Sequence, residues 1–131
     1  MSGDSPRLTF LSLFVPDLED AAQRYEAILG VAPSSSLGSA PQGHPFAAAG
    51  PVVFELGEVA LALYQCDQRA THPGDVGIGI EGEAGTAGAV AARARTNQGQ
   101  VFFGPRAISP DDAREMSVFV LPDRHFFEVV G

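Results

Sequence analysis

The sequence predicts an α+β fold made of two consecutive modules of the same kind. Each half of the 131 residues contains an apolar strand, then a helix, then further strands, in the same order. The first helix has marked ends, and an apolar hairpin follows it. Two βαβββ modules, at about residues 8–66 and 74–131, can pair their strands into one curved, half-closed mixed sheet with the helices outside. A chain of this length is expected to form a single domain, residues 1–131.

The opening strand is predicted at residues 8–15, which are almost wholly apolar and stop at Pro16. Such a run is too short for a helix and is typical of a strand buried on both faces. Because side chains alternate along a strand, Phe10, Ser12 and Phe14 share one face. The positions between them form a second apolar face.

A helix is predicted directly after this strand. Asp17 suits its N-cap, and the acidic residues that follow favour the positive N-terminus of a helix. Apolar residues then recur at three- and four-residue spacing, which indicates one buried stripe. Gly30 supplies the left-handed conformation that ends a helix.

The remaining elements follow from apolar runs and turn residues. Gly57 and Glu58 separate two apolar runs, and a two-residue connection with glycine first suits a tight hairpin turn. A second, alanine-rich helix is expected at residues 84–98. Pro105 and Pro110, with the aspartates after them, predict a loop. Further strands are expected at residues 52–56, 59–64, 76–80, 116–121 and 126–130, from 101 onward, and as a short edge strand near 46–49.

Composition restricts the classes of function. Sixteen acidic and eight basic residues give a formal net charge of −8, so the basic surface that a nucleic-acid binder needs is missing. Cys66 is the single cysteine, which rules out an internal disulfide. No N-terminal signal pattern is present, and no apolar run approaches the roughly 18 residues of a membrane-spanning helix. We expect a cytoplasmic protein whose partners include neither nucleic acid nor membrane.

Three stretches, in their order and spacing, carry a family resemblance. They are FLSLFVPDLEDAAQRYEAILG near the start, GDVGIGIEG at the start of the second half, and FVLPDRHFFEVV at the end. Together they resemble the vicinal oxygen chelate superfamily, which includes glyoxalase I, extradiol dioxygenases, methylmalonyl-CoA epimerases, and the fosfomycin- and bleomycin-resistance proteins. The last stretch departs from the superfamily's F-x-D-P-x-G-N-x-x-E, since Leu121 replaces Asp and Arg124-His125 replaces Gly-Asn.

The resemblance also implies where a metal would bind. Metal-dependent members hold a divalent ion inside the curved sheet with four side chains, two from each module. Matched position by position, these fall at Phe10, near Ala62, at Asp75 and at Glu128. Phenylalanine and alanine have no donor atom, and two carboxylates are fewer than the three or more ligands of a stable site. The inherited metal site is therefore expected to be broken, and no cofactor is expected.

The same matching predicts a pocket on the inward face of the sheet. Small residues there leave room, aromatic rings offer flat apolar walls, and carboxylates offer anchors for a cation. The alternative is that Phe10, Phe14 and Phe126 fill the cavity and leave a core without a ligand. The residues expected to line the pocket are Phe10, Ser12, Phe14, Ala62, Tyr64, Asp75 and Glu128.

Several chemically active residues also have a plainer interpretation. Glu128 either faces inward or faces solvent at a sheet edge, and if buried it needs a partner. Asp75 follows a Pro-Gly pair and is equally suited to a turn. Cys66 has no neighbouring motif that would make it a nucleophile. The histidines expected to be surface or packing residues, rather than ligands, are His44, His72 and His125.

These observations predict a metal-free protein that binds a small organic molecule. It would resemble the bleomycin-resistance type, which holds a planar, often cationic drug in a groove between two subunits, and a homodimer is expected. A second hypothesis is a lyase, isomerase or dioxygenase resembling glyoxalase, with His44 or His72 recruited to a metal. A third is a cofactor-free enzyme that uses Glu128 or Asp75 as general acid or base. A fourth is a dimeric fold without a small-molecule role.

Overall fold

A mixed sheet forms the centre of the structure, with its seven strands in the order β2-β3-β1-β4-β7-β6-β5. The computed structural model describes residues 6–38, 40–42, 44, 47, 49–66, 76–122 and 125–131, so His72 and Asp75 lie outside the described residues. These strands and two helices confirm the predicted α+β class. The elements are β1 (Arg7–Val15), α1 (Leu18–Leu29), β2 (Val52–Leu56), β3 (Val59–Gln65), β4 (Val76–Glu81), α2 (Thr86–Arg95), β5 (Gln100–Ser109), β6 (Asp112–Val120) and β7 (Phe126–Val130).

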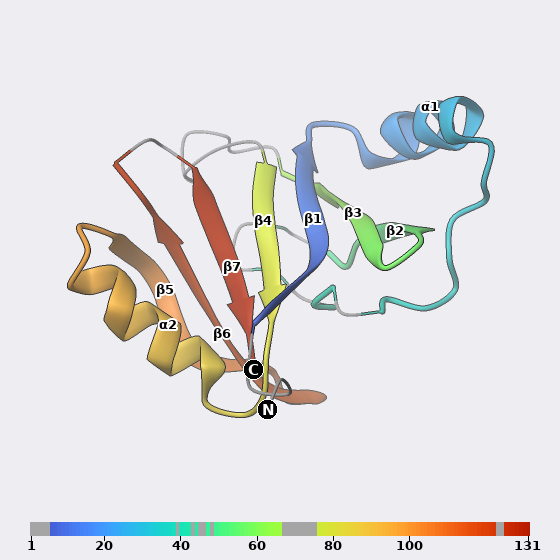
Figure 1. Cartoon of the computed structure of the whole chain (residues 1–131). Helices are drawn as coiled ribbons and strands as arrows, with labels where there is room; N and C mark the ends of the chain where they lie inside the picture. The colour runs from blue at the N-terminus through green and yellow to red at the C-terminus, as the bar shows by residue number, and fades with distance from the viewer. Residues whose placement is uncertain are drawn as a thin grey trace.

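The first strands of the two modules, β1 and β4, lie side by side in the middle of the sheet. They pair antiparallel, while β1 pairs parallel with β3 and β4 pairs parallel with β7. The modules therefore extend the sheet in opposite directions (Figure 1). The second module has the expected βαβββ order, whereas the described residues of the first form βαββ. Ala47 and Ala49, within the edge strand expected near residues 46–49, are not in a strand.

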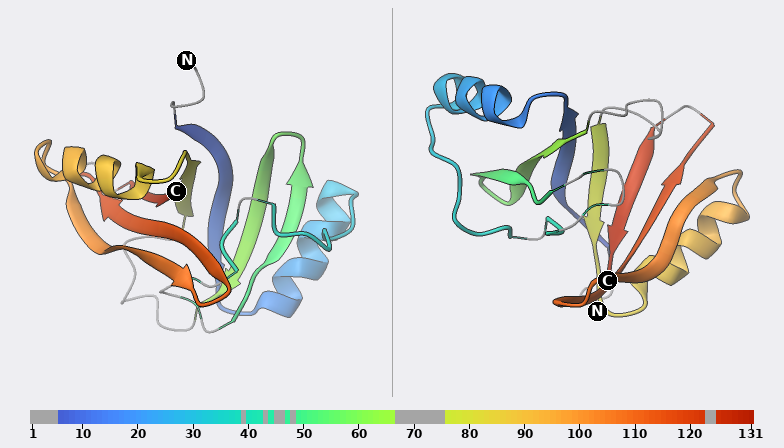
Figure 2. Two further views of the ribbon diagram at one scale, coloured as in Figure 1. Left: turned by 90° about the horizontal axis from the view of Figure 1, so that it is seen from below. Right: turned by 180° about the vertical axis from the view of Figure 1, so that it is seen from behind.

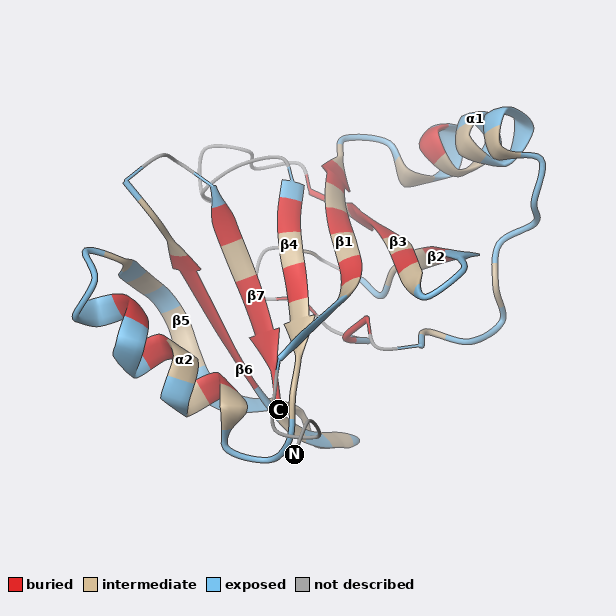
Figure 3. Cartoon of the chain, viewed as in Figure 1, coloured by how far each residue is buried: buried red, intermediate tan, exposed pale blue. Residues whose placement is uncertain are grey.

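Alternation along the strands separates the two faces of the sheet. In β1, Phe10, Ser12 and Phe14 are buried, and the residues between them are partly buried (Figure 3). Phe10 and Phe14 belong to a core cluster shared with β2, β3, β6 and β7. It lies on the side around which the sheet curves (Figure 2), which we call the concave face. α1 and α2 cover the opposite face, where each has its own apolar cluster.

The ends of α1 are those that its sequence predicts. The Asp17 side chain accepts a hydrogen bond from the backbone N–H of Asp20 at 3.1 Å, and Gly30 ends the helix with a φ of 75°. α1 buries little of its surface against the sheet, because Ala21 is its one buried residue and Ile28 is 75% exposed. An N-cap of this kind contributes about 1 kcal/mol, which matters for a thinly packed helix.

α2 is shorter than the helix expected at residues 84–98. The Asn97 side chain donates a hydrogen bond to the Arg93 carbonyl at 2.8 Å, which satisfies a C-terminal carbonyl and stops the helix early. On its packed face the Ser117 hydroxyl donates to the carbonyl of Ala87 at 2.9 Å. Neither described helix is long and apolar enough to cross a membrane.

The loop expected around Pro105, Pro110 and the aspartates is reduced to a turn at Pro110 and Asp111, which joins the two long strands of a hairpin. β5 passes through Pro105, which follows Gly104 in a cis peptide bond, and register shifts interrupt its antiparallel pairing with β6. β6 begins at Asp112, well before the strand expected at residues 116–121. Proline lacks a backbone N–H and cannot donate a hydrogen bond to a neighbouring strand. Because β5 lies at the edge of the sheet, Pro105 can occupy the strand without interrupting pairing on two sides.

Gly79→Ala is expected to destabilise the fold by about 1–3 kcal/mol through overpacking. A Cβ at position 79 would lie 2.4 Å from Cδ2 of Phe10, a ring with no exposed surface. The matched control is Gly88→Ala in α2, where the nearest atom, Cγ of Pro105, is 3.7 Å away and alanine favours the helix by about 0.5–1 kcal/mol. Urea unfolding measures both variants. Equal changes in stability would contradict close packing of Phe10 on β4.

Candidate functional site

The concave face holds the predicted pocket residues that the structure describes. Each is buried; strand periodicity predicted the shared face of the β1 residues, and the family resemblance implied that the others point to the same side. Asp75 lies outside the described residues, and the role of the whole set in binding stays a prediction. The residues placed here are Phe10, Ser12 and Phe14 in β1, Ala62 and Tyr64 in β3, and Glu128 in β7.

Glu128 is a carboxylate with no exposed surface on this face. Its neighbours across the sheet are Val118 in β6 and Gly79 in β4. Room for the carboxylate comes from Gly77, where a Cβ would lie 2.6 Å from Glu128 Oε1. The inward orientation, one of two that the sequence left open, is therefore the one observed.

His44 is the partner of Glu128. It lies in the connection between α1 and β2, and its Nε2 contacts Oε2 of Glu128, with both side chains fully buried. The packing expected of His44 is found, but its contact with Glu128 was not predicted. The two residues are 84 positions apart, so no local pattern connects them. The sequence pointed to this contact only indirectly, since a buried acid on an apolar strand needs a partner.

Aromatic rings surround this pair. The imidazole of His44 lies edge-on to Phe14, with ring centroids 4.8 Å apart, and 5.0 Å from the ring of Tyr64. Phe14 also stacks on Tyr64 at 5.7 Å and lies 5.9 Å from Phe126. The aromatic residues therefore cover much of the concave face, as the alternative to an open pocket anticipated. The imidazole of His44 occupies the position beside Oε2 of Glu128.

Tyr64 ties the same connection to the sheet a second time. Its hydroxyl donates a hydrogen bond to the carbonyl of Pro41 at 2.6 Å. Burial, and then the charge of Glu128, raise the pKa of Tyr64 far above its ordinary value. The phenol therefore keeps its proton and remains a donor. Pro41 and His44 are both held against the concave face by polar contacts.

Two buried oxygen atoms on this face have no hydrogen-bond partner among the described residues. They are Oε1 of Glu128 and the hydroxyl oxygen of Ser12, and both side chains lack exposed surface. Ser12 lies opposite Gly77 in the strand register, and Gly77 adjoins Oε1. Leaving a buried polar atom unpaired costs about 1–3 kcal/mol. The face therefore has unused hydrogen-bonding capacity next to Glu128.

A pocket of about 330 Å³ lies on the outer side of His44. It separates the connection that carries His44 from the turn of the β5–β6 hairpin. His44 is thus part of both the pocket wall and the buried pair. The pocket is lined by Gln42, His44, Ala47, Ala49, Gly50, Ser109 and Asp111.

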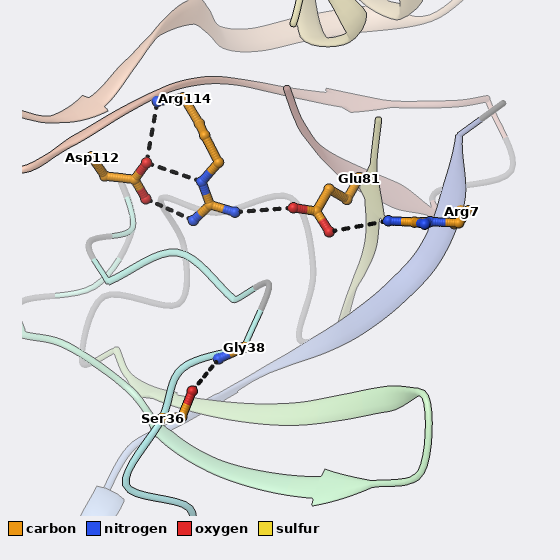
Figure 4. Close-up of polar contacts among 6 residues, drawn as sticks. All are labelled: Arg7, Ser36, Gly38, Glu81, Asp112 and Arg114. Atoms are coloured by element: carbon orange, nitrogen blue, oxygen red, sulfur yellow. Dashed lines mark hydrogen bonds and ion pairs between the residues drawn. The ribbon is translucent and has the colours of Figure 1, made fainter. Parts of the chain in front are cut away.

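Arg114 organises a charge network along the β4 and β6 strands (Figure 4). Its guanidinium donates to both carboxylate oxygens of Asp112, at 2.9 and 2.7 Å, and to Glu81 at 3.3 Å. Arg7 lies 3.7 Å from the same Glu81. The hydrogen bonds with Arg114 lower the pKa of Asp112, and those with Asp112 raise the pKa of Arg114. This guanidinium therefore pairs with acids other than Glu128.

The residues at the expected metal positions do not fit a divalent ion. Phe10 and Ala62 supply no donor, and the β4 residue that adjoins Glu128 is Gly77. His44 and Glu128 together offer one nitrogen donor and one carboxylate, fewer than a stable site needs. Across the described ranges, no group of three or more His, Cys, Asp or Glu side chains could hold a metal. The remaining expected position, Asp75, lies outside the described residues.

Comparison with protein-family models and with curated proteins gives no match. Solved structures are similar. A methylmalonyl-CoA epimerase variant from Streptomyces coelicolor, in complex with 2-nitronate-propionyl-CoA, has a TM-score of 0.63 at 16% identity and covers 95% of both chains. A glyoxalase/bleomycin resistance protein/dioxygenase superfamily member from Vibrio splendidus has a TM-score of 0.61 at 12% identity, covering 96% of this chain and 98% of that one.

An NAD-dependent benzaldehyde dehydrogenase from Legionella pneumophila is similar to the same degree. Its TM-score is 0.65 at 12% identity, and the match covers 92% of this chain and 96% of that chain. At such identities the similarity shows a shared fold. That fold is the one that the sequence resemblance implied.

Tyr64→Phe is expected to lower the free energy of unfolding by about 1–3 kcal/mol, because the carbonyl of Pro41 loses its donor. Tyr25→Phe in α1 is the matched control. Tyr25 is partly exposed, and its hydroxyl makes no hydrogen bond to another described residue, so a change within about 0.5 kcal/mol is expected. Chemical denaturation compares the two. A loss in Tyr25→Phe as large as in Tyr64→Phe would contradict this role for the Tyr64 hydroxyl.

Asp112→Asn is expected to reduce stability at pH 7 by up to about 1 kcal/mol, as for a partly exposed ion pair. The folded-state pKa of Asp112 lies below its ordinary value of 3.8, chiefly through hydrogen bonding to Arg114. Its contribution is therefore present above about pH 4 and is lost as the pH falls through the lowered folded-state pKa. Thermal unfolding from pH 7 to pH 2 measures this. Asp111→Asn, at an exposed neighbouring position, is the control. An Asp112→Asn protein that is still less stable than the parent protein at pH 2 would contradict the prediction.

Proposed function

We propose that this chain is a member of the glyoxalase/bleomycin resistance/dioxygenase superfamily and binds a small, planar, positively charged organic molecule. The observation that carries the proposal is the buried carboxylate of Glu128, held among aromatic rings and in contact with a basic heterocycle, His44. Binding without turnover is the proposed activity. This is the metal-free, bleomycin-resistance-like function that the sequence predicted.

The side chain of His44 supports the proposed ligand chemistry. Its imidazole is a flat ring with a nitrogen on the Glu128 carboxylate and aromatic neighbours at 4.8 and 5.0 Å. A planar organic cation can make the same kinds of contact, since aromatic rings attract cations and stack on flat π-systems. The protein thus holds, from its own chain, a group that resembles the proposed ligand.

The outer pocket provides space for the rest of such a ligand. Its volume of about 330 Å³ lies at the lower end of the range for small-molecule sites. This pocket and the buried pair have His44 in common. Asp111 places an acidic group in the pocket wall, which also favours a cation. Affinity is then reduced by the fraction of molecules in which His44 occupies the site.

A second candidate function is enzymatic, and the position of His44 is the observation that favours it. One histidine and one carboxylate in contact can act as a general acid–base pair, or as two ligands of a metal completed from elsewhere. Metal analysis of the purified protein separates the candidates. A stoichiometric divalent ion that disappears in both His44→Ala and Glu128→Gln would favour the enzyme.

A homodimer is also part of the proposal. Its support is the resemblance to a superfamily in which many members dimerise. Light scattering, which gives the mass in solution, tests it. A cytoplasmic location stays an expectation from the sequence.

The ligand proposal is tested with proflavine, a planar aromatic cation whose fluorescence reports binding. Glu128→Gln is expected to weaken binding at least about tenfold, or about 1.4 kcal/mol, because it removes the charge and keeps the shape. His44→Ala is expected to strengthen binding, because the competing imidazole is gone. The matched controls are Glu58→Gln in the exposed β2–β3 turn and His125→Ala, both expected to bind like the parent protein. Absence of binding by the parent and by His44→Ala would overturn the proposal.

A further inference from the structure

We infer that the ligand meets Glu128 through a group with two parallel N–H donors: an amidinium, a guanidinium or a 2-amino-N-heterocycle. The inference rests on the proposed function and specifies the polar end of the ligand. A simple ammonium carries the same charge, but its donors do not lie in a planar fork. The distinction comes from the geometry of the carboxylate and its surroundings.

The two oxygens of Glu128 differ in their partners. Oε2 contacts Nε2 of His44, while Oε1 is buried and has no hydrogen-bond partner among the described residues. An imidazole presents one ring nitrogen to a carboxylate, so it satisfies one oxygen at a time. A planar fork of two N–H groups satisfies both oxygens with parallel hydrogen bonds.

Oε1 of Glu128 is buried next to β4, at a point where that strand has a glycine. β4 has Gly77 at the adjoining position, so no side chain from that residue covers Oε1. Across the register from Gly77 lies Ser12, whose buried hydroxyl lies near the phenol of Tyr64 and makes no hydrogen bond of normal geometry in the described structure. Two unused oxygen atoms therefore belong to neighbouring positions on the same face. A hydroxyl both donates and accepts, so Ser12 can pair with a further nitrogen of an amino-heterocycle.

The chain's own guanidinium on neighbouring strands does not fill this role. Arg114 gives its forked donors to Asp112 and a third hydrogen bond to Glu81. The Asp112–Arg114 pair shows in the same sheet the two-donor recognition that Glu128 lacks. Among the described residues, the hydrogen-bonding partner of Glu128 is His44.

The aromatic neighbours favour an amidine conjugated to a ring. Phe14 and Tyr64 lie stacked with centroids 5.7 Å apart, and His44 lies beside both. An aryl amidine keeps its charged fork close to the plane of its ring, so one flat body can contact the aromatic wall and the carboxylate together. The flexible methylene of an aryl methylamine does not impose this alignment.

Benzamidine and benzylamine test the inference, because both carry one aromatic ring and one positive charge. Calorimetric titration of His44→Ala is expected to show benzamidine binding at least about tenfold more tightly than benzylamine. Glu128→Gln in the same background is expected to abolish the preference, and Glu58→Gln is expected to retain it. Equal affinities would overturn the inference and leave the proposed function standing. Failure of both cations to bind would also overturn the inference, and it would overturn the proposed function where proflavine fails to bind as well.

A second measurement does not depend on the Glu128 variant. Titration of the parent protein with benzamidine, followed by NMR, is expected to shift the ring signals of His44 at concentrations about tenfold below those needed with benzylamine. The ring signals of His125, an exposed residue, are the internal control and are expected to stay unchanged. Equal concentration dependence of the His44 signals for the two cations would contradict recognition by this carboxylate.

Discussion

The contact between His44 and Glu128 is the interaction on which the arrangement of the concave face depends. A carboxylate without exposed surface is costly to bury unless a partner compensates it, and β7 is otherwise apolar around Glu128. The partner comes from outside the sheet, from the connection between α1 and β2. That connection therefore has to lie over the concave face. The hydrogen bond from Tyr64 to Pro41 holds it at a second point.

Under the proposed function, binding chemistry and stability share these atoms. The pair that closes the face would then also select what replaces it, since a ligand with a positive, flat group restores what Glu128 loses. Such a site is specific at a cost in affinity, because every ligand competes with a tethered group. Discrimination between ligands then depends on how each ligand differs from an imidazole, including the number of N–H donors that it presents to Glu128.

The sequence predicted those parts of the fold that local rules decide. Asp17 and Gly30 bound α1 as expected, and strand periodicity placed Phe10 and Glu128 on one face. Errors arose where position in the sheet overrides local preference. Pro105 lies inside an edge strand rather than a loop. The His44–Glu128 contact was missed because it joins residues brought together by the whole topology.

The glycines of β4 also bear on how easily this protein could change its chemistry. A donor side chain at position 77 would collide with the Glu128 carboxylate at 2.6 Å and with the Phe126 ring at 2.7 Å. Position 79 is closed in the same way by the ring of Phe10. Neither β4 position therefore accepts a larger residue on its own, and a change of chemistry at either one requires a compensating change in Phe10, Phe126 or Glu128.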